Sequence, residues 1–97
     1  MINMPRMICR RSFVSGRVQG VFYRATCVRK AQELGITGFA RNLADGRVEV
    51  LACGEAAVVE AFVKWLWEGS SASKVTAVDT SEVDAASIQR TTSFTSG

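Results

Sequence analysis

Hydrophobic and polar positions alternate in several short stretches, which are separated by two longer stretches with helical spacing. The alternating stretches predict strands at about residues 11–15, 36–43, 47–53 and 75–83, with a short tail strand around 93–95. Apolar side chains recur every three or four positions over about 22–34 and 55–68, which predicts two helices. The predicted order is β-α-β-β-α-β followed by the tail strand.

Glycines mark the ends of these segments. Gly35 follows the first predicted helix and Gly69 the second, as expected of residues that end helices in the left-handed conformation. Between the second and third strands, Asp45-Gly46 predicts a tight hairpin, because both residues can adopt positive φ. The fourth strand alternates loosely, which is typical of an edge strand.

This order is typical of the ferredoxin-like α+β sandwich, a mixed, mostly antiparallel sheet with two helices on one face. In that fold the first two strands run in the same direction, with the third strand between them. We therefore expect residues 16–21, after the first strand, and residues 42–43, at the end of the second, at the same edge of the sheet. The expected domain covers residues 8–97 and follows an N-terminal extension, residues 1–7.

Composition excludes several classes of protein. The 97 residues are 47% hydrophobic and 22% charged, which fits one globular domain. No apolar run approaches the ~20 residues of a membrane span, and residues 1–11 lack the apolar core of a secretory signal. We therefore expect a cytoplasmic protein with no membrane association.

The chain contains no histidine, which excludes Ser-His and Cys-His nucleophile pairs and most zinc sites. The three cysteines, Cys9, Cys27 and Cys53, lack the CxxC spacing of a thiolate metal site, so no metal is expected. We expect all three to be small buried side chains with free thiols, as an odd number in a reducing compartment suggests.

Charge is distributed unevenly along the chain. Residues 1–50 contain nine Lys and Arg against three acidic residues, whereas residues 51–97 contain three against six. A basic half attracts either nucleic acid or a small phosphorylated ligand through the same Coulomb interaction. The asymmetry therefore indicates an anionic partner without choosing between the two.

Candidate chemistry gathers at the shared sheet edge. Gly16 and Gly20 flank a strand–loop–helix turn whose main-chain N–H groups could form a nest for a tetrahedral anion, although two glycines also suit an ordinary turn. Arg24 follows in the first turn of the helix, where a cation is unfavourable for the helix dipole but could clamp a phosphate. Asn42 could orient a water molecule, or simply begin the hairpin.

Two segments resemble the signatures of the acylphosphatase family. The first signature, G-x-V-Q-G-V-x-F/Y-R, resembles Gly16-Arg17-Val18-Gln19-Gly20-Val21-Phe22-Tyr23-Arg24. The second resembles Gly38-Phe39-Ala40-Arg41-Asn42, continuing through Gly46, Val48 and Gly54. Chain length and element order also match the family over about residues 8–95.

The resemblance implies hydrolysis of the carboxyl–phosphate anhydride of acyl phosphates to carboxylate and inorganic phosphate. It implies that Arg24 holds the phosphoryl group, that Asn42 positions the attacking water, and that no metal or cofactor is needed. It also implies a phosphate-binding loop that consists of Gly16, Arg17, Val18, Gln19, Gly20 and Val21. We expect Gln19 to brace this loop, and the protein to be a monomer whose partners are the acyl phosphate or another anion.

The alternative is a nucleic-acid-binding module, because RNA recognition motifs share this topology and the first half of the chain is basic. Such modules carry aromatic side chains on a central strand of the open sheet face. The third predicted strand, residues 47–53, contains no aromatic residue. We therefore rank an acyl phosphate above nucleic acid as the ligand.

Overall fold

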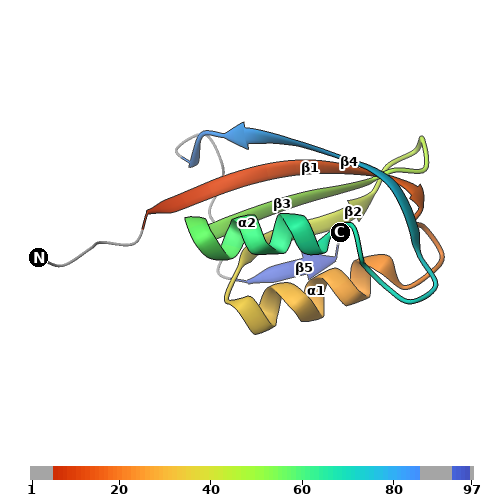
Figure 1. Ribbon diagram of the computed structural model, residues 1–97, viewed down its shortest axis with the longest axis horizontal. Helices are drawn as coiled ribbons and strands as arrows, with labels where there is room; N and C mark the ends of the chain where they lie inside the picture. The colour runs from red at the N-terminus through yellow and green to blue at the C-terminus, as the bar shows by residue number, and fades with distance from the viewer. Residues whose placement is uncertain (1–5, 86–92, 97) are drawn as a thin grey trace, which may run out of the picture.

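The computed structural model describes residues 6–85 and 93–96. Both helices cover one face of a five-stranded sheet (Figure 1). The elements are β1 (Met7–Arg17), α1 (Tyr23–Leu34), β2 (Thr37–Asn42), β3 (Val48–Glu55), α2 (Ala56–Trp65), β4 (Lys74–Val83) and β5 (Phe94–Ser96). The predicted α+β fold and element order are confirmed.

The sheet has the strand order β4-β1-β3-β2-β5. Since β3 is antiparallel to both β1 and β2, these two strands run in the same direction and end at one edge of the sheet. Residues 18–22, called the β1–α1 loop below, leave the sheet at that edge. The predicted edge position of β4 is confirmed, and the tail strand β5 pairs in parallel with β2.

The core lies between the helices and the covered face of the sheet. Tyr23, Cys27 and Ala31 of α1 are buried at the spacing that the sequence predicts, since each is at most 1% exposed. In α2, Phe62 packs edge-on against Phe94 of β5, with ring centroids 5.7 Å apart. No helix within residues 6–85 or 93–96 is long and apolar enough to cross a membrane.

Strand β1 is longer than the hydrophobic pattern predicts. Arg10 lies outside the predicted strand and Arg11 begins it, and each is paired with an acidic side chain of a neighbouring strand. Arg10 lies 3.3 Å from Glu82 of β4, and Arg11 lies 3.0 Å from Glu49 of β3. Met7, which the sequence assigns to the N-terminal extension, is already a strand residue. Residues 1–5 of that extension lie outside the described residues.

The β2–β3 hairpin differs from the predicted turn. Gly46 has a φ of 95°, but Asp45 does not adopt positive φ, because Phe22 is the single described non-glycine residue that does. Leu43 N instead donates to Arg47 O at 2.8 Å, and Arg47 N donates to the Asp45 carboxylate at 3.1 Å. Together with the Arg47 side chain, this bond lowers the pKa of Asp45. The hairpin is therefore less tight than predicted, because β2 ends at Asn42 and β3 begins at Val48, and a side-chain hydrogen bond closes the longer loop.

Two of the three cysteines form a disulfide, so the prediction of three free thiols is wrong for Cys9 and Cys53. These residues lie opposite each other in the β1–β3 pairing, with Cα atoms 4.1 Å apart. They are 44 residues apart in the chain, and the strand register alone brings them together. Cys27 is buried and free, as expected.

Replacing Gly38 with alanine is expected to destabilise the fold by about 2–4 kcal/mol. Gly38 has a φ of 136°, and a Cβ atom there would overlap the main-chain oxygen of Leu51 on β3. Gly46→Ala is the matched control, because its φ is also positive but its Cβ would meet open space. Urea unfolding of both variants measures the difference, and equal losses would contradict the steric explanation.

Candidate active site

The β1–α1 loop is held by side chains from two other parts of the chain. Gln19 Nε2 donates to the main-chain oxygens of Leu43 and Arg47, at 2.8 and 3.0 Å. Ser70 Oγ donates to the main-chain oxygen of Val21 at 2.6 Å. The loop is therefore fixed to the β2–β3 hairpin and to the segment after α2, and Gln19 has the bracing position expected of it.

The loop enters α1 through Phe22, whose φ of 62° lies in the left-handed region. Thr26 donates from its main-chain N and its Oγ1 to the main-chain oxygen of Phe22, at 3.1 and 2.8 Å. The next residue, Tyr23, is buried, and its hydroxyl donates to Leu66 O at 2.7 Å. These hydrogen bonds hold Phe22 and the first turn of the helix in place.

Main-chain N–H groups from Gln19 to Ala25 donate no hydrogen bond to any residue of 6–85 or 93–96. The set includes the first-turn donors that every helix leaves without an internal partner. Adjacent free donors at the positive end of a helix dipole favour a bound anion. The loop and the first turn of α1 thus carry free donors at the place where the sequence predicts an anion nest.

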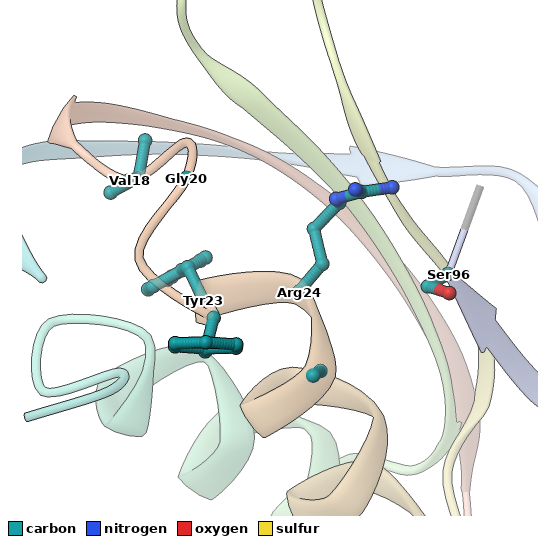
Figure 2. Close-up of a pocket in the computed structure, with 7 residues that line it drawn as sticks. Val18, Gly20, Tyr23, Arg24 and Ser96 are labelled. Atoms are coloured by element: carbon teal, nitrogen blue, oxygen red, sulfur yellow. The ribbon is translucent and has the colours of Figure 1, made fainter. Parts of the chain in front are cut away.

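Arg24 lines a cavity of about 310 Å³ together with Val18, Gly20 and Phe22. Its side chain extends from the first turn of α1, between the β1–α1 loop and Ser96 of β5 (Figure 2). Within the described part of the chain, the guanidinium forms no ion pair or hydrogen bond. A half-buried, uncompensated positive charge therefore stands beside the free N–H groups.

Asn42 ends β2 at the same edge of the sheet. Its partner in the β3 register is Val48, which is also the partner of Val14 on β1. Two residues earlier on β2, Ala40 pairs with Ser96, which lines the Arg24 cavity. The exposed Asn42 thus lies at the edge beside the cavity, although it is not among the residues that line it.

Gly16 and Arg17 belong to the sheet rather than to the loop. They pair with Val75 and Lys74 of β4, after an irregularity in the register between Ser15 and Gly16. Gly16 has a φ of 117°, and a Cβ atom there would overlap the main-chain oxygen of Lys74. The observed loop therefore contains Val18 to Val21 of the predicted segment. Gly16 instead allows the backbone of β4 to lie close to β1, because it has no Cβ atom.

A buried carboxylate between two arginines was missed by the sequence reasoning. Glu49 is 5% exposed and pairs with Arg41 at 2.6 Å and with Arg11 at 3.0 Å. Arg41 also lies over the ring of Phe39, 5.1 Å from its centroid. The tight turn predicted at Asp45-Gly46 would place Glu49 opposite Asn42, whereas the longer observed loop places it opposite Arg41. This pairing accounts for Arg41 as a structural residue next to Asn42.

No group of three or more His, Cys, Asp or Glu residues within 6–85 and 93–96 is arranged to hold a metal ion. A second cavity, of about 540 Å³, lies at the start of β1 and is lined by Arg6, Arg10 and Glu82, among others. It is at the opposite end of β1 from the β1–α1 loop. Among the described residues, the Arg24 cavity joins free main-chain donors of a helix start to an unpaired cation.

Stability should fall as the pH rises above about 9, because burial raises the pKa of Cys27 from 9.0 to about 12. Burial also raises the pKa of Tyr23. The folded state keeps both protons, whereas the unfolded state releases them above the ordinary pKa values. Each group then lowers the unfolding free energy by about 1.4 kcal/mol per pH unit.

Urea unfolding between pH 7 and pH 10.5 measures this loss. Cys27→Ala is the matched variant, since it removes one of the two groups and leaves Tyr23 in place. Its unfolding free energy should be lower at neutral pH, because of the cavity it creates, but should fall less steeply above pH 9. An unchanged slope would contradict the assignment to Cys27.

Comparison with known proteins identifies the relatives of this chain. The sequence profile of the acylphosphatase family matches residues 10–95. A protein named acylphosphatase from Chromohalobacter salexigens is 51% identical over 76 residues, which cover 78% of this chain and 84% of that protein.

Two solved structures are also similar. The structure of an acylphosphatase from Coxiella burnetii has a TM-score of 0.86 and 37% identity, and the match covers 94% of this chain and 93% of that one. The crystal structure of the acylphosphatase from Bacillus subtilis has the same TM-score and 34% identity, over 95% of this chain and 99% of that one. With this sequence similarity over the same sheet and helices, the chain belongs to the acylphosphatase family.

Proposed function

We propose that this chain, a hydrolase of the acylphosphatase family, acts on acyl phosphates through Arg24, Asn42 and the main chain of the β1–α1 loop. The observation that carries the proposal is the run of unpaired N–H groups from Gln19 to Ala25, beside the unpaired guanidinium of Arg24. Main-chain donors and a guanidinium are the groups that bind a phosphoryl dianion best. The comparisons favour this function over the nucleic-acid-binding alternative.

In the proposed reaction, the oxygen of a water molecule attacks phosphorus and the bond between phosphorus and the carboxyl oxygen breaks. The carboxylate leaves with the electron pair, and the proton of the water passes to a phosphoryl oxygen. A carboxylate is a stable leaving group, so no general acid is needed. This chemistry suits a chain without histidine.

Each proposed residue has a distinct part in this reaction. Arg24 and the loop N–H groups neutralise charge on the phosphoryl oxygens, most strongly in the transition state. The Asn42 amide accepts a hydrogen bond from the attacking water and orients it. Gln19 keeps the loop against the hairpin that follows Asn42. The loop N–H groups and Asn42 therefore keep a fixed position relative to each other.

Phosphate release from benzoyl phosphate, measured with and without EDTA, tests the proposal. We expect equal rates in both conditions, because the positive groups come from the protein itself. Inorganic phosphate should inhibit competitively, since it would occupy the same N–H groups. Loss of activity in EDTA with recovery on adding a divalent metal would show that the metal-independent reaction is wrong.

We also propose that the protein is a monomer. The loop, Arg24 and Asn42 all come from one chain, so the site needs no second copy. Sedimentation measures the oligomeric state.

The location that we propose is the cytoplasm. The disulfide between Cys9 and Cys53 argues against this location, because disulfides are rare in reducing compartments. Alkylation of free thiols during cell lysis, followed by mass measurement, should find both cysteines reduced if the protein is cytoplasmic, whereas an intact disulfide would contradict that location.

A further inference from the structure

Phe22 is a large aromatic side chain held in solvent at the mouth of the Arg24 cavity. Its side chain is 80% exposed, more than any other large hydrophobic residue of the described ranges 6–85 and 93–96. It lines the same cavity as Arg24 and Gly20. An exposed aromatic ring in a concave site is a common contact for an apolar part of a ligand.

The position of this ring is costly and firmly held. A φ of 62° is unfavourable for a bulky side chain, whereas glycine or asparagine would adopt it easily. Val21 and Tyr23, on either side, are buried, so the alternation along the loop directs Phe22 outward. The Phe22 oxygen accepts two hydrogen bonds from Thr26, which keep the residue in place. Loop geometry explains the conformation, but it does not explain why the residue is aromatic.

The cavity has room for more than the phosphoryl group. Its volume is about 310 Å³, whereas a phosphoryl group is a single tetrahedral anion. The donors for that anion come from the main chain and from Arg24. The ring of Phe22 carries no hydrogen-bonding group, so it does not bind the phosphoryl group. The acyl group is the part of the substrate that remains to be contacted.

We propose that Phe22 is a specificity-determining residue that contacts the acyl group and favours acyl phosphates with an aromatic or bulky apolar acyl group. This inference rests on the proposed role of Arg24, because the phosphoryl group must first be placed beside the helix N-terminus. A ring–ring contact of ordinary strength corresponds to about a 3- to 10-fold preference. The preference should appear mainly in KM, since the contact is present before and during the reaction.

The test compares benzoyl phosphate with acetyl phosphate for the wild-type protein and for three variants, Phe22→Ala, Phe22→Gly and Phe22→Leu. Phe22→Gly removes the ring and adopts the positive φ without strain, so it separates the side chain from the backbone. We expect the alanine and glycine variants to raise KM for benzoyl phosphate about 3- to 10-fold. The loss on acetyl phosphate should be smaller than the loss on benzoyl phosphate, because any disturbance of the loop backbone affects both substrates equally, and the leucine variant should be intermediate.

Trp67→Ala is the matched control, because Trp67 is another exposed aromatic residue, at 53%, that does not line the cavity. It should leave the ratio of the two substrates unchanged. Equal losses on both substrates in the Phe22 variants would show that the residue only positions the loop, and an unchanged ratio with full activity would also overturn the inference. Failure of the wild-type protein to hydrolyse either substrate would instead overturn the proposed function.

Discussion

Arg24→Ala is expected to lower kcat/KM for benzoyl phosphate by about 30- to 1,000-fold, equivalent to about 2–4 kcal/mol of transition-state stabilisation. The guanidinium has no partner in the described part of the chain, so its removal leaves no buried acidic group uncompensated. The fold should stay intact and should even gain a little, because a cation at a helix N-terminus opposes the helix dipole. Phosphate-release kinetics and urea unfolding measure the two effects.

Arg29→Ala is the matched control for this experiment. Arg29 lies on the same helix but is exposed and does not line the cavity, so its loss should change kcat/KM less than about twofold. Arg24→Lys should fall between wild type and Arg24→Ala, since it keeps the charge but loses the planar pair of donors. A variant without Arg24 that kept near-full activity would contradict the proposed role.

Asn42→Ala is expected to lower kcat by a similar factor, about 30- to 1,000-fold, with a smaller change in KM. The proposed contact is with the attacking water rather than with the phosphoryl group, so substrate binding should be largely retained. The Asn42 side chain is exposed and forms no hydrogen bond within the described residues, so stability should change little. Single-turnover kinetics at saturating substrate measures the loss directly.

Asp45→Asn is the control for Asn42, because it alters an exposed side chain of the same hairpin without entering the cavity. It should keep most of the activity. An Asn42→Ala variant with unchanged kcat but a much higher KM would show that Asn42 binds the substrate instead of orienting water. Lower unfolding free energy in that variant would indicate a structural role.

Much of the fold could be predicted because its helices and strands follow simple spacing rules. Tyr23, Cys27 and Ala31 recur at helical intervals, and their burial follows directly from that pattern. Ends of elements were harder to predict, since they depend on partners in other strands. Arg10 is a strand residue because its main chain pairs with both β3 and β4, and nothing near Arg10 in the sequence reveals this.

The sheet edge that carries the candidate site could be predicted from the sequence. The ion pairs, the disulfide and the strand irregularity around it could not. Strand direction alone brings residues 16–21 and Asn42 to one edge of the sheet, and the structure has that arrangement. The carboxylate of Glu49 and the disulfide were missed because both depend on strand register, which sequence spacing does not provide. The register shift between Ser15 and Gly16 was missed for the same reason, because it depends on how β4 pairs with β1.

The segment that follows α2 contacts the β1–α1 loop and the start of α1. Ser70 holds the oxygen of Val21, and Gly69 lies so close to the ring of Tyr23 that a Cβ atom there would overlap it. Neither residue belongs to the two signature segments. A genetic selection for altered turnover should therefore recover second-site changes at Gly69 and Ser70, more than 40 positions away in the chain from Arg24.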